Sequence, residues 1–352
     1  MFEMKERDNN FGILKLIAAM LVIIGHMYNL LGYSAPAFLW KSIHGIGVGI
    51  LFTVGGYLNA LSYSKDLSYI KYLIKRIFRI FPPLIFCVMI CIFIVGPWVT
   101  EISLKEYFTH PMTWGYLKNV ILNINYILPG CFLDNPYANV VNGSIWCLPL
   151  QFLLYLLIPI YIKIGKRMDE IPKVQKFYYY GSTLVIIVIS CVYQGCLEGS
   201  IFYHNTVSKW LELVPYWFVG SLFAMCKIEK YLNLQVSTVM IFFGLATAFA
   251  SGKITIILQY ILLPYIVLSF AVTEKAIFKK FNMRDISYGI FLFGFVIQQF
   301  LIWIFIKNGI ELNISILLIL SIGLSAMAGI ITEILLERPL RKICSRYLKN
   351  IK

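Results

Sequence analysis

Two ionisable residues interrupt the first long apolar stretch of the sequence, FGILKLIAAMLVIIGHMYNLL, which runs from Phe11 to Leu31. These residues, Lys15 and His26, are eleven positions apart. At about 100° per residue, this spacing places both side chains on one face of a helix, with a rise between them of roughly 16 Å. If the helix crosses a membrane, Lys15 lies near one surface and His26 lies well inside.

Two interpretations of this pair are open at this point. An ionisable side chain at membrane depth is costly and usually marks a site or a pathway, and a neutral imidazole there suits a general base. Alternatively, His26 is a hydrogen-bonded packing residue and Lys15 extends its amine to the membrane surface. The cost of placing an imidazole in hydrocarbon favours the functional interpretation.

A second candidate group is Arg76 with Arg79, which are three residues apart and therefore share a face if the segment is helical. Arginine binds phosphates well through its planar fork of donors. Alternatively, the two arginines are ordinary basic residues at the membrane surface that contact lipid headgroups. Spacing alone favours that alternative.

The stretch VNGSIWCLPLQFLLYLLIPI begins with a turn at Asn142-Gly143 and a helix N-cap at Ser144. Trp146 suits an interfacial anchor. Gln151 is a polar group at membrane depth and needs a partner there. The segment is equally compatible with a site and with a helix held by one interhelical hydrogen bond.

Composition identifies the elements that must position these residues. Of the 352 residues, 59% are hydrophobic and only 14% are charged, whereas a soluble domain carries roughly 25% charged residues. The sequence therefore predicts a polytopic membrane protein with an all-α fold and a single domain over residues 1–352. The eight cysteines show no metal-ligand spacing, and the pairing of Cys131 with Cys196 stays open.

Apolar segments of spanning length predict about ten transmembrane helices. They cover residues 11–31, 43–62, 80–98, 144–162, 177–194, 207–226, 233–250, 254–272, 286–306 and 312–334. The more polar segment 99–143 is expected to be extracytoplasmic or re-entrant. Closely spaced glycines in the second helix, including Gly55 and Gly56, predict close helix packing.

The distribution of basic residues predicts the orientation of these ten spans in the membrane. The two tails and the loops on the same side as the tails hold 24 of the 31 Lys and Arg residues. This asymmetry predicts that both termini are cytoplasmic. It also accounts for the net charge of +14 without nucleic acid as a partner.

Five segments in order resemble the membrane acyltransferase 3 family of bacterial integral-membrane O-acyltransferases. They are Lys15 with His26, Arg76-Ile77-Phe78-Arg79 with Pro82, NGSIWCLPLQF, ISYGIFLFGFVIQQ, and Glu337-Arg338-Pro339 with Arg341. Three positions depart from the family's pattern: Gln151 replaces a frequent Glu, Gly55 a frequent Ser and Gly294 a frequent His. The chain ends 18 residues after the last predicted helix, so the resemblance implies a member without the fused SGNH domain.

The resemblance implies transfer of an acyl group, most often acetyl, from acyl-CoA to a hydroxyl of a cell-surface polysaccharide or a lipid-linked sugar. It implies a multi-pass protein of the bacterial inner or cytoplasmic membrane, in contact with membrane lipids, with no tightly bound cofactor and no metal. The implied roles are His26 as the catalytic residue, Lys15, Arg76 and Arg79 as donor-binding residues, and Asn142, Trp146, Gln151 and Tyr288 as supporting residues.

Two other classes of function compete with this expectation. A transporter or flippase of a lipid-linked glycan precursor would carry ionisable residues on several midplane helices, often in repeated halves. Such residues are scarce here outside the first helix, and no internal repeat is found. A non-catalytic scaffold derived from an enzyme is the other alternative, and Gln151 and Gly294 are its main support.

Overall fold

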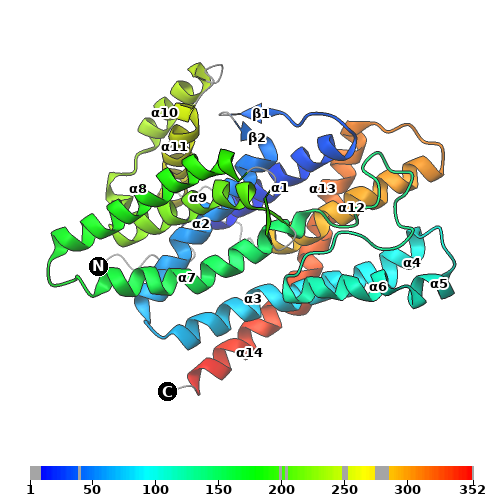
Figure 1. The fold of residues 1–352 in the computed structure, drawn as a ribbon, viewed down its shortest axis with the longest axis horizontal. Coiled ribbons are helices and arrows are strands. Elements are labelled where there is room, and N and C mark those ends of the chain that lie inside the picture. The colour runs from blue at the N-terminus through cyan, green and yellow to red at the C-terminus, as the bar shows by residue number, and fades with distance from the viewer. Residues whose placement is uncertain are drawn as a thin grey trace. The chain divides into compact units, whose positions relative to one another are not determined.

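The computed structural model describes residues 9–38, 41–197, 200–202, 205–247, 253–273 and 285–350. Over these residues the chain is mostly helical, with two minimal hairpins, which confirms the all-α prediction (Figure 1). In the first half the elements are α1 (Phe11–Leu30), β1 (Ala37–Phe38), β2 (Lys41–Ser42), α2 (Ile43–Lys65), α3 (Tyr69–Ile90), η1 (Cys91–Val95), α4 (Gly96–Val99), α5 (Leu104–Thr109), α6 (Pro111–Gly115), η2 (Tyr116–Ile121), η3 (Ser144–Cys147) and α7 (Leu148–Lys166). The second half contains α8 (Pro172–Cys196), β3 (Ile201–Phe202), β4 (Asn205–Thr206), α9 (Val207–Met225), η4 (Ile228–Tyr231), α10 (Leu234–Ala246), α11 (Lys253–Val272), α12 (Ser287–Lys307), α13 (Ile314–Thr332), η5 (Glu333–Glu337) and α14 (Arg338–Lys349).

Seven helical segments of the described chain are long and apolar enough to cross a membrane. They are Phe11–Leu30, Ile43–Lys65, Tyr69–Val99, Ser144–Lys166, Pro172–Gln194, Ser287–Lys307 and Ile314–Lys349. The other three predicted spans coincide with α9, α10 and α11, which are not among the seven. The count of ten and the orientation of the termini stay predictions, and residues 1–8 and the loop near residue 280 lie outside the described residues.

The third helix begins eleven residues earlier than the sequence predicts, at Tyr69 rather than near residue 80. Its first turns carry basic residues on one side and are amphipathic, so a search for apolar segments does not include them. Pro82 and Pro83 therefore lie inside α3 rather than near its start, which corrects the expectation. Since proline has no N–H, the carbonyls of Phe78 and Arg79 lose their intrahelical donors.

The chain divides into two compact units. The first unit comprises residues 1–18, 37–73 and 150–284, and in it α2 packs against α9 and α9 against α8. Gly56 allows this close approach, because a Cβ atom there would overlap the carbonyl oxygen of Trp217. Gly220 has the same role from the α9 side, against the carbonyl oxygen of Thr53. The close packing predicted from the glycines of the second helix is confirmed.

The second unit comprises residues 19–36, 74–149 and 285–352, and in it α12 and α13 lie side by side (Figure 1). The two helices approach closely where a Cβ atom at Gly289 would lie 2.8 Å from the Cα atom of Gly329. An apolar cluster fills the space where the end of α1 meets these helices. Its buried members are Met27, Leu30, Phe295, Leu301, Ile302, Phe305 and Leu317.

Residues 100–143 form short helices and turns, and no stretch among them is long enough to cross a membrane. The turns are held locally, since the side chain of Asn119 both donates to and accepts from the backbone of Asn125. Cys131 is buried here and its thiol donates to the carbonyl of Gly96. Burial raises the pKa of the Cys131 thiol to about 12. Cys131 is a free thiol here, and the side chain of Cys196 lies outside those described.

Candidate active site

Helix α1 carries both Lys15 and His26 on one uninterrupted stretch, Phe11–Leu30, as the spacing argument requires. Both side chains are half-buried. The imidazole of His26 meets the ring of Phe295 edge-on, with ring centroids 5.4 Å apart and planes at 79°. His26 is therefore an ionisable group on an apolar helix, packed on one side against an aromatic ring of α12.

The surroundings of His26 fix the orientation of this turn of α1. Met27, the next residue, and Leu30 are buried in the apolar cluster that also contains Phe295. Gln298, one turn after Phe295 on α12, donates from Nε2 to the carbonyl oxygen of Ile23 at 2.8 Å. Apolar packing and this hydrogen bond together hold the His26 turn against α12.

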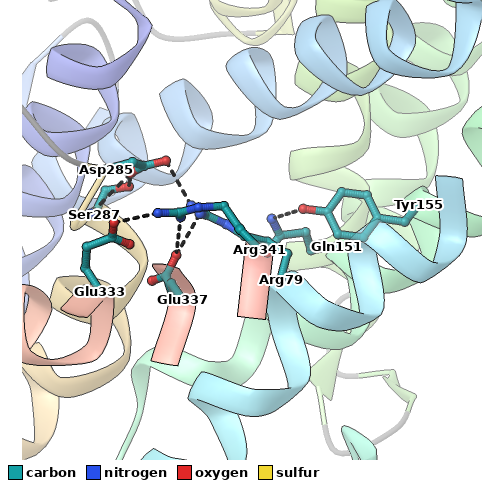
Figure 2. Close-up of polar contacts among 8 residues, drawn as sticks. All are labelled: Arg79, Gln151, Tyr155, Asp285, Ser287, Glu333, Glu337 and Arg341. Carbon is teal, nitrogen blue, oxygen red and sulfur yellow. Dashed lines mark hydrogen bonds and ion pairs between the residues drawn. The ribbon is translucent and has the colours of Figure 1, made fainter. Parts of the chain in front are cut away.

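Arg79 lies at the centre of a group of charged side chains in the second unit (Figure 2). Its Nη1 donates to Oε2 of Glu337 at 2.7 Å, and its Nη2 donates to Oδ2 of Asp285 at 2.9 Å. Asp285 also accepts a 2.6 Å hydrogen bond from the hydroxyl of Ser287, next to the start of α12. The two terminal nitrogens of Arg79 thus each donate to a different carboxylate.

Arg341 joins the same group from α14 (Figure 2). It donates to Oε1 of Glu333 at 2.5 Å and lies 3.5 Å from Oε2 of Glu337. Glu333 and Glu337 are 2–3% exposed, so each needs a cationic partner. They mark the two ends of η5, a π-helical turn, and such turns are frequent at functional sites.

Tyr288 connects this charged group to α3. Its hydroxyl donates to the carbonyl oxygen of Ile80 at 3.0 Å, and the guanidinium of Arg79 lies 5.8 Å from the centre of its ring. Arg76 lies one turn before Arg79 on α3, and its side chain is half-buried. The two residues between the arginines, Ile77 and Phe78, are apolar. The structure thus brings Arg79 and Tyr288 together, as members of one charged and aromatic group.

Asn142 is buried and organises the start of the segment that leads into α7. Its Nδ2 donates to the carbonyl oxygen of Leu292 at 2.9 Å, and its Oδ1 accepts from the backbone N–H of Ser144. The expected N-cap at Ser144 is wrong, because Ser144 already lies within the helical turn η3, whose N-cap residue is Gly143. Trp146 is half-buried in the same turn. Asn142 ties this turn to α12.

Gln151 lies in the first unit and has its partner on its own helix (Figure 2). Its Nε2 donates to the hydroxyl of Tyr155, four residues later on α7, at 2.9 Å. The interhelical hydrogen bond that the sequence left open is thus replaced by one within α7. Tyr155 packs in turn against Trp217, with ring centroids 5.4 Å apart.

The structure gives a physical reason for two of the three departures from the family pattern. A Cβ atom at Gly55 would lie 2.6 Å from the ring of Trp217, so glycine makes room for this indole. A Cβ atom at Gly294 would lie 3.0 Å from Cγ1 of Ile23, so a larger side chain there requires Ile23 to move. Large neighbours occupy the space that a side chain at either position would fill.

Sequence reasoning missed three residues that the structure brings to these groups: Asp285, Glu333 and Gln298. Glu333 has a detectable signal, because it is an acid inside an apolar helix and lies four residues before Glu337. Asp285 directly precedes the ISYG stretch and could be noticed only as an acid at a helix start. Gln298 has a polar neighbour in Gln299, and nothing in the sequence separates their roles.

Comparison with known proteins assigns the chain to a family. The family model described as an acyltransferase domain matches residues 8–333, nearly the whole chain. The chain belongs to the acyltransferase 3 family. It is an O-acyltransferase.

Two curated relatives of this acyltransferase are similar to it. An O-acetyl transferase of Shigella phage Sf6 is 28% identical over 312 residues, which cover 84% of this chain and 86% of that protein. Nodulation protein 10 of Rhizobium leguminosarum bv. viciae is 28% identical over 172 residues, 45% of each chain. No solved structure matches.

Proposed function

We propose that this O-acyltransferase moves an acetyl group from acetyl-CoA to a hydroxyl of a cell-surface polysaccharide or of a lipid-linked sugar, in the bacterial cell membrane. The observation that supports it most is the alignment with the phage O-acetyl transferase over 84% of the chain. Membership of the family argues against the transporter and scaffold alternatives.

His26 is the residue to which we assign the catalytic role. It takes the proton of the acceptor hydroxyl on an unprotonated ring nitrogen while the hydroxyl oxygen attacks the thioester carbonyl carbon. The carbon–sulfur bond then breaks, and the imidazolium returns the proton to the leaving thiolate. The products are an acetyl ester and free CoA. An acyl-His intermediate is the alternative route.

Lys15, Arg76 and Arg79 are assigned to the donor. The charge pattern of the sequence predicts that all three lie at the cytoplasmic side, where acyl-CoA is available. The phosphates of CoA are polyanionic and suit guanidinium groups. Lys15 lies about 16 Å from His26 along α1, so a donor held by its phosphates near that surface can extend its uncharged arm toward the imidazole.

The two carboxylates bound to Arg79 limit how this arginine can bind the donor. Since its two terminal nitrogens already donate to Asp285 and Glu337, a phosphate must compete with carboxylates to bind it. We therefore propose that Arg79 orients the surrounding residues as well as adding positive charge, and that it shares the phosphates of the donor with Arg76. Asn142 and Tyr288 support the site through the hydrogen bonds described above. The family resemblance assigns supporting roles to Trp146 and Gln151 as well.

The experiment that tests the proposed function uses purified protein in detergent with acetyl-CoA labelled in the acetyl group. Free CoA should appear together with an alkali-labile label on a glycan or lipid-linked sugar fraction. Failure to consume acetyl-CoA in the presence of such fractions contradicts the proposal. Movement of a glycan precursor across vesicles without consumption of acetyl-CoA would favour a transporter instead.

A further inference from the structure

Gln298 on α12 is fully buried, and only one end of its amide is used. Its Nε2 donates to the carbonyl oxygen of Ile23, which fixes the orientation of the amide because only the NH₂ group can donate. Its Oε1 has no hydrogen-bond partner among the described residues. A buried acceptor left in this state costs about 1–3 kcal/mol, so a donor that reaches this oxygen would bind favourably.

The amide of Gln298 lies at the turn of α1 that carries His26. Ile23 precedes His26 by three residues, and helix carbonyls point toward the C-terminal end, that is, toward His26. Phe295, one turn before Gln298 on the same helix, contacts the imidazole edge-on. The unused oxygen is therefore next to the proposed catalytic turn.

Two serine hydroxyls of α13 share this environment. Ser325 and Ser321 are fully buried, and neither hydroxyl has a partner in the described part of the chain. A Cβ atom at Gly294 would lie 3.7 Å from Oγ of Ser325 and 3.0 Å from Cγ1 of Ile23, so Ser325 faces the contact of α12 with α1.

Helix geometry places the second serine opposite the glutamine. Gly289 faces Gly329 and Gly294 faces Ser325, so α12 and α13 are antiparallel. One turn further along, Gln298 on α12 therefore comes opposite Ser321 on α13. Helix geometry thus places three buried oxygens, none with a partner among the described residues, along the junction of α1, α12 and α13.

The chemistry of these groups indicates the class of ligand. Glutamine Oε1 only accepts hydrogen bonds, and each serine hydroxyl both donates and accepts. All three groups are uncharged, so they suit a neutral group that also carries both donors and acceptors. A sugar hydroxyl fits, whereas a phosphate would be attracted to cations instead. Serine hydroxyls in helices often rotate to bond a carbonyl of the preceding turn. Gln298 is therefore the main residue of this site, and the two serines are additional contacts.

We propose that Gln298, Ser321 and Ser325 form an acceptor subsite that binds a hydroxyl neighbouring the one acylated at His26. This inference rests on the proposed function and adds a specificity-determining residue to it. The subsite holds the sugar by a hydroxyl that does not react, which presents the reacting hydroxyl to the imidazole.

The chain supplies a matched control in the next residue. Gln299 is also fully buried, but both ends of its amide are used. Its Nε2 donates to the carbonyl oxygens of Tyr137 and Val140, and its Oε1 accepts from Asn135. Gln299 is therefore structural, and replacing it reports the cost of removing a buried amide from α12 without touching the proposed subsite.

The test measures transfer from acetyl-CoA to a panel of p-nitrophenyl hexopyranosides and their monodeoxy analogues by purified protein. For the wild-type protein, kcat/KM should be about tenfold or more lower for one deoxy analogue than for the parent hexoside. This factor corresponds to the loss of one hydrogen bond. Gln298→Leu should raise the KM for the parent hexoside by about the same factor and should no longer discriminate against that analogue. The KM for acetyl-CoA should stay unchanged. Ser325→Ala and Ser321→Ala should show smaller effects of the same kind.

Gln299→Leu should lower the Tm and keep the discrimination. The inference is overturned if Gln298→Leu keeps wild-type discrimination, if it changes only the Tm as Gln299→Leu does, or if wild type consumes acetyl-CoA but accepts no hexoside. A wild-type protein that never consumes acetyl-CoA would overturn the proposed function together with this inference.

Discussion

Arg79 on α3 donates from Nη1 to Oε2 of Glu337, which lies 258 residues further along the chain, at a distance of 2.7 Å. Glu337 is 3% exposed, so its charge depends on this partner and on Arg341. The motif arginine of α3 and the motif glutamate near the C-terminal end thus act as a pair in the same unit. Their functions cannot be assigned separately.

Arg79→Ala should therefore destabilise the protein as well as impair it. Breaking a buried ion pair from one side leaves an uncompensated charge and typically costs about 3–5 kcal/mol. The measurement is thermal unfolding in detergent, with Arg338→Ala, an exposed neighbour on α14, as the control. Arg79→Lys should recover only part of the loss, because one amine cannot reach both carboxylates in the geometry of the fork. An unchanged Tm in Arg79→Ala would show that the pair does not stabilise the fold.

Arg76→Ala should weaken donor binding. Loss of a hydrogen bond to a charged group costs about 1.5–3 kcal/mol, which corresponds to roughly a 10- to 100-fold rise in the KM for acetyl-CoA. Lys75→Ala is the matched control, since Lys75 is the exposed neighbouring cation. Equal donor KM values for wild type and Arg76→Ala would refute the assignment of this arginine.

Gly56→Ala should destabilise the first unit, because the added Cβ atom overlaps the carbonyl oxygen of Trp217 on α9. Overpacking of this kind costs about 1–3 kcal/mol. Gly181→Ala on α8 is the control, since a Cβ atom there meets nothing within 4 Å. It should be neutral or stabilise the helix by up to about 1 kcal/mol. A higher Tm in both variants would contradict the close packing of α2 against α9.

The sequence predicts most of the helices because each apolar helix is defined by one contiguous stretch of residues. The apolar runs of α1 and α12 are continuous and give their bounds to within a few residues. The predicted start of α3 was wrong because the first turns of this helix are amphipathic and basic, so hydropathy does not detect them.

The partners of the candidate site residues could not be predicted in the same way. Asp285 is 206 residues from Arg79 in the chain, and no local pattern connects them. The contrast between Gln298 and Gln299 is likewise tertiary, because it depends on which carbonyls each amide reaches. Motif resemblance locates functional positions, and packing decides what each of them contacts.

The orientation of the chain in the membrane is testable independently of the chemistry. The 24 of 31 basic residues assigned to one side predict that the segment around residue 120 is extracytoplasmic. Fusions of an enzyme active only in the periplasm should report activity at residue 120 and none at residue 170. The opposite pattern of reporter activity would invert the orientation and remove the argument for a cytoplasmic donor.

The role of His26 is tested most directly by acetyl transfer per mole of folded protein in His26→Ala and His26→Gln. Removal of a general base typically lowers the rate by about 10²- to 10⁴-fold, and by more if the residue is also a nucleophile. Glutamine retains size and hydrogen bonding but cannot take up a proton at neutral pH, so both variants should be inactive while still inserting and binding CoA. Near wild-type turnover in His26→Gln would make His26 a packing residue and contradict the mechanism.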